Sequence, residues 1–133
     1  MLYYSQRKYG AAKPLYKQAL TIFENVLGEN HPVTANSYGN LARVHKALDE
    51  YEKAESLSRS ALNIHKKTLG ENHPDTATSY LNLGGFYYDR GKAQDGLELC
   101  EKALKIYQKT LPAGHPHIQL CEDWVEEIKN SMS

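Results

Sequence analysis

Apolar residues recur every three or four positions in six successive stretches of the chain, which is the spacing of amphipathic helices. The expected helices span residues 9–27, 33–48, 51–69, 75–89, 93–111 and 117–131. Residues 1–8 are expected to be the tail of a preceding helix. Because a proline inside a helix removes a hydrogen bond, Pro14 should make the first long helix start late or bend.

A six-residue signature separates these helices. Leu27-Gly28-Glu29-Asn30-His31-Pro32 returns unchanged 42 residues later as 69–74, and a degenerate copy follows at 111–116. A fixed period of this kind indicates stacked repeats, in which positions 42 residues apart are equivalent. Gly28 should close one helix in the left-handed conformation, while Asn30 and His31 should lie at or just before the N-cap of the next helix. Tyr3 is equivalent to His45 and Tyr87, so we expect the chain to open within a unit, as part of a longer array.

Small and apolar residues also recur at equivalent positions, which predicts tight helix packing. Two sets of small residues let helix axes approach closely: Ala19, Ala61 and Ala103, and Ala12, Ala54 and Gly96. In residues 117–131 the apolar stripe is kept, but the other faces are strongly polar, which is typical of a helix that caps a repeat array.

Composition excludes several classes of protein. Lys and Arg number 16 and Asp and Glu number 16, and this balance argues against nucleic acid or an acidic membrane surface as the partner. There is no apolar run of about 20 residues, so no membrane span is expected, and no secretory signal is visible at Met1–Tyr4. Cys100 and Cys121 fit a reducing compartment, where ordinary buried thiols are favoured over a redox role. We therefore expect a cytoplasmic protein.

The residues that could bind a metal or act as an acid–base pair have simpler structural interpretations. The histidines of the three signatures lie on different turns, too far apart for one zinc ion, and are expected to cap helices: His31, His73 and His115. His45 is expected to pack in the core. Four carboxylates near the C-terminus are expected to form a solvated face: Glu122, Asp123, Glu126 and Glu127. No phosphate loop or nucleophile motif occurs, so we predict no catalytic residue, metal or cofactor.

The segment Tyr80-x2-Leu83-Gly84-x2-Tyr87 resembles the first helix of the tetratricopeptide repeat, and Ala54, Ala61 and Leu62 match its second helix. The 42-residue period resembles the long form of this repeat, typified by kinesin light chains. The resemblance implies an all-α, right-handed superhelical solenoid of antiparallel helix pairs. The whole chain, 1–133, would form one array: a partial unit, two full units and a capping helix with its tail, at 1–32, 33–74, 75–116 and 117–133.

The resemblance also implies a concave groove, lined by the first helix of each pair, that binds an extended peptide. The implied groove residues are Asn36, Asn40, Arg43, Lys46, Thr78, Asn82, Tyr88 and Asp89. Gly85 replaces the equivalent Arg43, and Asp89 adds negative charge, so an acidic peptide is less favoured than in kinesin light chains. The predicted function is a protein-interaction scaffold with a protein or peptide partner. The alternatives are a homodimer formed through exposed end helices, and a regulatory or sensor segment of a larger enzyme or signalling protein.

Overall fold

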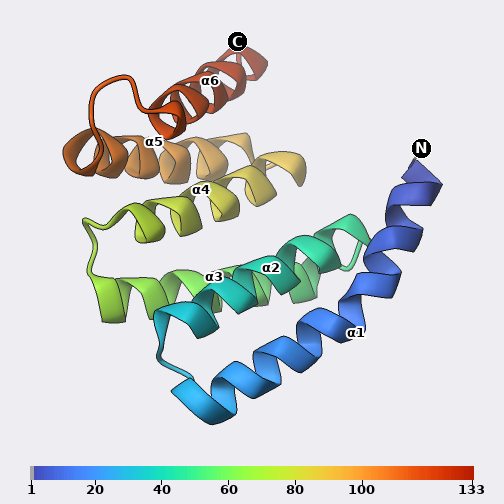
Figure 1. Ribbon diagram of the computed structural model, residues 1–133. Coiled ribbons are helices and arrows are strands. Elements are labelled where there is room, and N and C mark those ends of the chain that lie inside the picture. Colours follow the sequence, from blue (N-terminus) through green and yellow to red (C-terminus); the bar gives the residue numbers. More distant parts are fainter. Residues whose placement is uncertain (1) are drawn as a thin grey trace. The chain divides into compact units, whose positions relative to one another are not determined.

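The computed structural model describes residues 2–133, with side chains from Lys8 onward, and it contains six α-helices and no strand in that range (Figure 1). The helices are α1 (Leu2–Leu27), α2 (Pro32–Ala47), α3 (Tyr51–Leu69), α4 (Pro74–Asp89), α5 (Ala93–Thr110) and α6 (Pro116–Ser131). The predicted all-α fold class is confirmed, and five of the six helices begin and end within one residue of their predicted bounds.

The first helix differs from its prediction. Residues 2–8 and 9–27 form one continuous helix rather than a tail followed by a new helix. The equivalent turns contain Asp49 and Gly91, both with positive φ (63° and 81°), whereas Arg7 occupies this position in α1. A left-handed arginine is sterically unfavourable, so the chain continues as a helix. Pro14 lies inside α1, which does not start late; Figure 1 shows the helix changing direction part-way along. The side chain of Tyr3 lies outside the described residues.

The signature turns are built as predicted. Gly28 and Gly70 both have φ of 90° and end their helices in the left-handed region. His31 and His73 are the N-caps of α2 and α4, and each Nδ1 accepts a backbone N–H two residues later, at 3.1 and 3.0 Å. In the third, degenerate copy, proline occupies position 112 and cannot adopt positive φ, so the left-handed residue moves to Gly114.

A buried threonine completes each of the two intact turns. The Thr34 hydroxyl donates to the Gly28 carbonyl at 2.8 Å, and the Thr76 hydroxyl donates to the Gly70 carbonyl at 2.7 Å. Both threonines are fully buried. These bonds satisfy carbonyl groups near the helix end that have no partner inside the helix.

The chain divides into two compact units, Met1–Thr68 (unit 1) and Leu69–Ser133 (unit 2). In unit 1, α1 is joined to α2 by the Tyr38 hydroxyl, which donates to Glu24 at 2.8 Å, and to the α2–α3 turn by Lys13, whose Nζ lies 2.9 Å from Glu50. In unit 2, α4 and α5 approach so closely that a Cβ on Gly96 would lie 2.7 Å from the carbonyl oxygen of Gly84. The prediction that Gly96 occupies a tight helix contact is therefore confirmed.

Four of the six predicted small residues are buried in the cores of the two units. Ala54 and Ala61 in α3 and Ala103 in α5 are almost fully buried. Ala12 and Ala19 in α1 are only partly buried. The α1 helix therefore carries the repeat's packing residues without burying them as α3 and α5 do.

Candidate functional site

In both helix pairs, a polar contact joins the first helix to the second. The two contacts lie at equivalent positions but use different side chains. In unit 1, His65 Nε2 of α3 lies 3.0 Å from Asn36 Oδ1 of α2. In unit 2, the Tyr107 hydroxyl of α5 lies 2.5 Å from the Thr78 hydroxyl of α4. Both Asn36 and Thr78 were predicted groove residues, but each uses a polar atom to bind its own second helix. Their side chains are therefore partly committed to packing.

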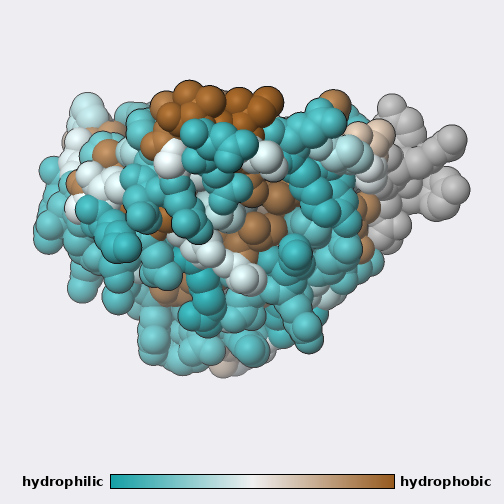
Figure 2. All heavy atoms as spheres, turned by 90° about the horizontal axis from the view of Figure 1, so that it is seen from below, coloured by the Kyte–Doolittle hydropathy of each residue, from teal (hydrophilic) through white to brown (hydrophobic). Residues whose placement is uncertain are grey.

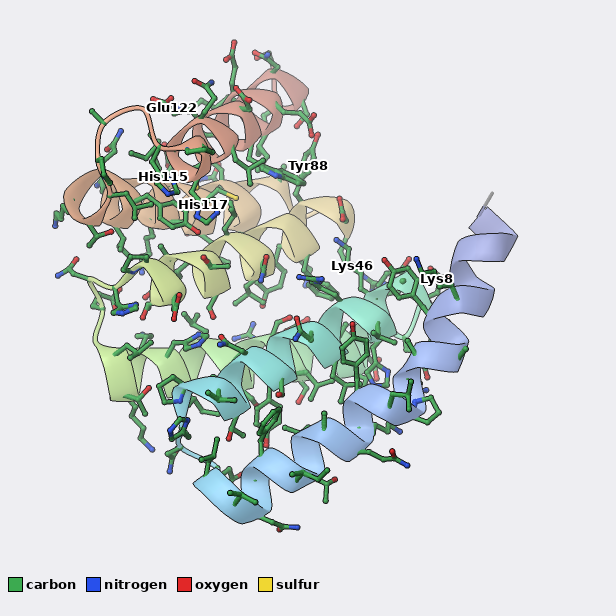
Figure 3. All side chains as sticks on the ribbon, in the orientation of Figure 1. Lys8, Lys46, Tyr88, His115, His117 and Glu122 are labelled. Carbon is green, nitrogen blue, oxygen red and sulfur yellow. The ribbon has the colours of Figure 1, made fainter. Side chains whose placement is uncertain are left out.

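One face of α2 presents polar side chains to solvent. Asn36, Asn40 and Arg43 are spaced by four and three residues, so they lie along one side of the helix, and all three are exposed. Lys46, one turn further, is half-buried and has interactions of its own (Figure 3). Of these residues, Asn40 and Arg43 are the most available to a partner.

The corresponding face of α4 is more mixed. Asn82 and Asp89 are exposed, whereas Thr78 and Tyr88 are half-buried. Tyr88, labelled in Figure 3, meets Trp124 of α6 edge-on, with ring centroids 6.0 Å apart. The ring of Tyr88 therefore forms an aromatic pair with a tryptophan from α6.

Trp124 and Leu120 of α6 are not among the predicted groove residues. A Cβ on Gly85 would lie 3.7 Å from Cη2 of Trp124, so the indole packs over the space that the missing side chain leaves. Leu120, one turn before Trp124 on α6, is exposed. The repeat period could have identified both, because Trp124 is equivalent to Asn82 and Leu120 is equivalent to Thr78.

Charge is divided unequally between the two units although the whole chain is neutral. Unit 1 contains ten Lys or Arg and six Asp or Glu, whereas unit 2 contains six and ten. The exposed Arg43 belongs to the basic unit, and Asp89 belongs to the acidic unit. A partner with charge of its own would therefore interact differently with each unit.

His45 is a buried core histidine, as predicted. Its Nδ1 lies 3.1 Å from Glu50, and its Nε2 is buried without a hydrogen-bond partner. Burial lowers the pKa of His45, although the Glu50 carboxylate opposes this shift. The pKa of Glu50 is also lowered, chiefly by its hydrogen bond from Lys13. The three side chains fasten the turn between α2 and α3 to α1.

Two tyrosines at equivalent positions donate to carboxylates. Tyr38 donates to Glu24, and Tyr80 donates to Glu71 at 2.5 Å. Burial, together with the adjacent carboxylate, raises the pKa of each phenol to about 12. Both tyrosines therefore remain protonated donors and act as packing residues.

An open pocket of about 330 Å³ lies between the end of α5 and the start of α6. It is lined by Gln108, Ala113, Gly114, His115, Ile118, Gln119 and Glu122. The rings of His115 and His117 are 4.8 Å apart at this point (Figure 3). His115 Nδ1 already accepts the His117 backbone N–H at 3.0 Å, so this nitrogen is occupied by its capping role.

The remaining reactive groups are inaccessible or dispersed. Cys100 and Cys121 are free thiols with no exposed surface, and burial raises their pKa values to about 11 and about 12. Such thiols are poor nucleophiles because little thiolate forms. Within residues 2–133, no three His, Cys, Asp or Glu side chains are grouped as metal ligands would be. None of the six described helices combines the length and apolar character that crossing a membrane requires.

Comparison with known proteins identifies the repeat. The sequence matches the model of the Tetratricopeptide repeat family over residues 1–67 and again over residues 40–109. No curated protein matches the chain. Several solved structures match the chain over nearly its whole length.

The crystal structure of BtubC (BKLC) from P. vanneervenii is 26% identical, with a TM-score of 0.85, and the match covers 94% of this chain and 50% of that one. A Podosopora anserina protein assigned as a kinesin light chain, with nearly identical TPR-like repeats, is 27% identical, with a TM-score of 0.82. That match covers 96% of this chain and 61% of the other, so the chain spans only part of the length of both structures. With two family matches that together reach from residue 1 to residue 109, the chain belongs to the tetratricopeptide repeat family and is similar to kinesin light chain-like members.

Proposed function

We propose that the protein is an interaction module that binds an extended segment of a partner protein along the exposed faces of α2 and α4. The family is a protein-interaction scaffold, which supports binding of a protein in general. The observation that carries the finer proposal is the exposure of Asn40 and Asn82 at equivalent positions of two first helices. An asparagine side chain offers two donors and one acceptor, so it can pair with an extended main chain.

The neighbouring residues set the chemistry of the partner. Arg43 lies one turn beyond Asn40 and is exposed, so it suits a carboxylate on the bound segment. Near Asn82, the half-buried rings of Tyr88 and Trp124 suit an apolar side chain. The acidic character of unit 2 favours a positive charge on the part of the partner that meets this unit. The proposed partner segment is therefore mixed in charge and carries one apolar anchor.

Predicted groove residues that already make contacts within the protein contribute less to binding of the partner. Asn36 and Thr78 use polar atoms for the bonds to His65 and Tyr107, so we assign them a supporting role. Lys46 and Asp89 already have interactions of their own and are secondary contacts. This order of importance separates the proposal from a uniform groove in which all eight predicted residues contribute equally.

Calorimetry against a peptide selected by display screening tests the proposal. Lost hydrogen bonds contribute about 0.5–1.5 kcal/mol each, so Asn40→Ala with Asn82→Ala should weaken binding about tenfold. Arg43→Glu should weaken binding further, and the difference from the parent should shrink as salt is added. The matched control is Asn63→Ala, which removes an exposed asparagine from a second helix, α3.

The melting temperatures of all these variants should stay close to that of the parent, because each side chain is exposed. An unchanged affinity in the Asn40, Asn82 and Arg43 variants would exclude this face of both helices as the binding surface. A loss of affinity in the Asn63 variant would instead place the partner on the second helices.

A further inference from the structure

The pocket between α5 and α6 corresponds to a place that a tyrosine ring fills at both intact signature turns. Tyr38 and Tyr80 are equivalent to Glu122, which lines this pocket of about 330 Å³ and is labelled in Figure 3. The Tyr80 side chain is only 2% exposed, and its hydroxyl donates to Glu71. Because a carboxylate side chain is shorter than a phenol, the replacement leaves space beside the third turn.

The groups that bind the two tyrosine hydroxyls have also changed at the third turn. The acceptors in the intact copies are Glu24 and Glu71, and their equivalents are Gln108 and Ala113, which both line the pocket. Ile118, a third lining residue, replaces the buried threonine of the intact turns. The third turn therefore lacks the phenol and its carboxylate partner, and it has a new carboxylate at the position of the phenol.

The residues of α6 themselves keep this pocket open. In α4, a Cβ on Gly84 would lie 2.8 Å from Cys100 Sγ of α5, and Ala77, seven residues before Gly84 on the same side of the helix, is fully buried. Their equivalents in α6 are Glu126 and Gln119. A helix packed on α6 as α5 packs on α4 would bury a carboxylate and an amide, which is unfavourable. This face of α6 is therefore suited to solvent or to a polar ligand.

The pocket offers hydrogen-bond acceptors beside a small apolar surface. Glu122 is exposed and negatively charged, and no lysine or arginine is among the described residues that line the pocket. The side-chain nitrogen of Gln119 donates to Asp123 at 2.9 Å, which leaves the Gln119 carbonyl oxygen as an acceptor. Ile118 and Ala113 supply apolar surface. Unit 2, to which all these residues belong, has more acidic than basic side chains.

The chemistry of the pocket differs from that of the exposed hydrophobic surface of the chain. Most of the exposed large hydrophobic residues belong to α1, and Figure 2, which views the molecule from the side where α1 lies in Figure 1, shows hydrophobic side chains gathered on that face. Among the described residues, none of these exposed large hydrophobic side chains lines the pocket. A ligand with several donors is therefore better suited to the pocket than an apolar one.

We propose that the pocket binds an arginine side chain of a partner protein. A guanidinium group carries five N–H donors in one plane, so it can donate two of them to Glu122 and another to the Gln119 carbonyl oxygen. Its aliphatic stem would pack on Ile118 and Ala113. A lysine ammonium has three donors around a single atom and cannot form the same paired contact. The flat guanidinium also suits a space that a flat phenol fills at the two intact turns.

Titration of the isotopically labelled protein by nuclear magnetic resonance tests the site. The probe is N-acetyl-arginine-N-methylamide, which presents the side chain without free backbone charges. The backbone amide signals of Gly114, Ile118 and Glu122 should shift and saturate at millimolar probe. The citrulline analogue has the same shape without the charge and should bind about tenfold more weakly. Added salt should weaken binding of the arginine probe. Equal affinity for the two probes, or shifts that do not saturate, would overturn the proposal.

Variants of α6 test which carboxylate binds the probe. Glu122→Gln keeps the size of the side chain and should weaken binding about tenfold. The matched control is Glu127→Gln, which removes an exposed carboxylate of α6 outside the pocket and should bind like the parent. Glu122→Tyr introduces the residue found at the equivalent Tyr80 and should abolish binding by filling the pocket, with the helical circular dichroism retained. If Glu122→Tyr does not fold, Glu122→Gln decides the outcome.

The remaining outcomes separate this site from others. Unchanged affinity in Glu122→Gln, or an equal loss in Glu127→Gln, overturns the proposal. Tighter binding of free arginine than of the capped residue would indicate a site for the amino acid and would overturn the assignment to a partner's side chain. The site does not rest on the proposed function, because Asn40 and Asn82 do not line the pocket. Asn40→Ala with Asn82→Ala should therefore leave binding of the arginine probe unchanged.

Discussion

The contact between α4 and α5 at Gly84 and Gly96 leads to a prediction in which two opposing effects can be compared. In an exposed helix interior, replacing glycine by alanine stabilises the fold by about 1 kcal/mol, because alanine loses less conformational freedom on folding. At Gly96 the new Cβ would lie 2.7 Å from the Gly84 carbonyl oxygen and 3.1 Å from the Tyr88 backbone nitrogen. Both of these are backbone atoms, so no side-chain rotation can relieve the contact.

Overpacking of this kind typically costs about 1–3 kcal/mol. We therefore expect Gly96→Ala to lower the free energy of unfolding by up to about 2 kcal/mol, despite the gain in helix propensity. The matched variant is Gly39→Ala in the interior of α2, where nothing lies within 4 Å of the added Cβ. That substitution should raise the free energy of unfolding by about 0.5–1 kcal/mol.

Urea unfolding followed by circular dichroism measures both variants. The single tryptophan, Trp124, lies in the same unit as Gly96, so its fluorescence follows unfolding of that unit separately. The two variants should shift the unfolding midpoint in opposite directions. A Gly96→Ala protein as stable as the Gly39→Ala protein would show that the two helices are further apart than the structure places them.

Three more predictions concern stability. Burial lowers the pKa of His45, so at low pH the unfolded chain binds a proton that the folded chain does not. The free energy of unfolding should therefore fall as the pH drops from 7 through the ordinary imidazole value of about 6.5 towards 5. His45→Tyr, which introduces the residue found at the equivalent Tyr87, should make the urea midpoint depend less on pH. His73→Ala removes the N-cap of α4 and should cost about 0.5–2 kcal/mol in urea unfolding, and an unchanged midpoint would contradict the capping role. Ala61→Leu should cost about 1–3 kcal/mol by overpacking, whereas Lys67→Leu on the exposed side of the same helix should melt like the parent.

The fold was largely predictable from the sequence because each turn is determined by residues within or next to the turn. Glycine at the end of a helix and histidine with proline at the start of the next act within a few residues, so the period located them correctly. The continuity of α1 was missed because apolar spacing does not reveal where a helix stops. That information lies in which residue tolerates positive φ, and Arg7 does not.

The candidate site was less predictable because it depends on neighbours. The exposure of Asn40 and Asn82 follows from their place in the helical pattern. The bond from Asn36 to His65 depends on a side chain 29 residues away whose equivalent is a tyrosine. No local pattern predicts such a pair, because equivalent positions carry different polar groups in the two units: asparagine and histidine in unit 1, and threonine and tyrosine in unit 2. The predicted right-handed superhelix and the boundaries of the single array stay predictions.

The two intact signature turns have a consequence for how such a chain can change in length. Each turn is completed by bonds among residues 28–34 or 70–76, through the left-handed glycine, the capping histidine and the buried threonine. None of these bonds involves a residue outside its own turn. A block of 42 residues that begins in one such turn and ends in the next can therefore be inserted or removed with the residues of each turn still present. A gene segment of this length could be duplicated or lost with every joint still formed. Deleting residues 33–74 would place Asp75 directly after Pro32, in the position that Val33 now occupies. The new turn would again contain glycine, histidine, proline and threonine in their original order.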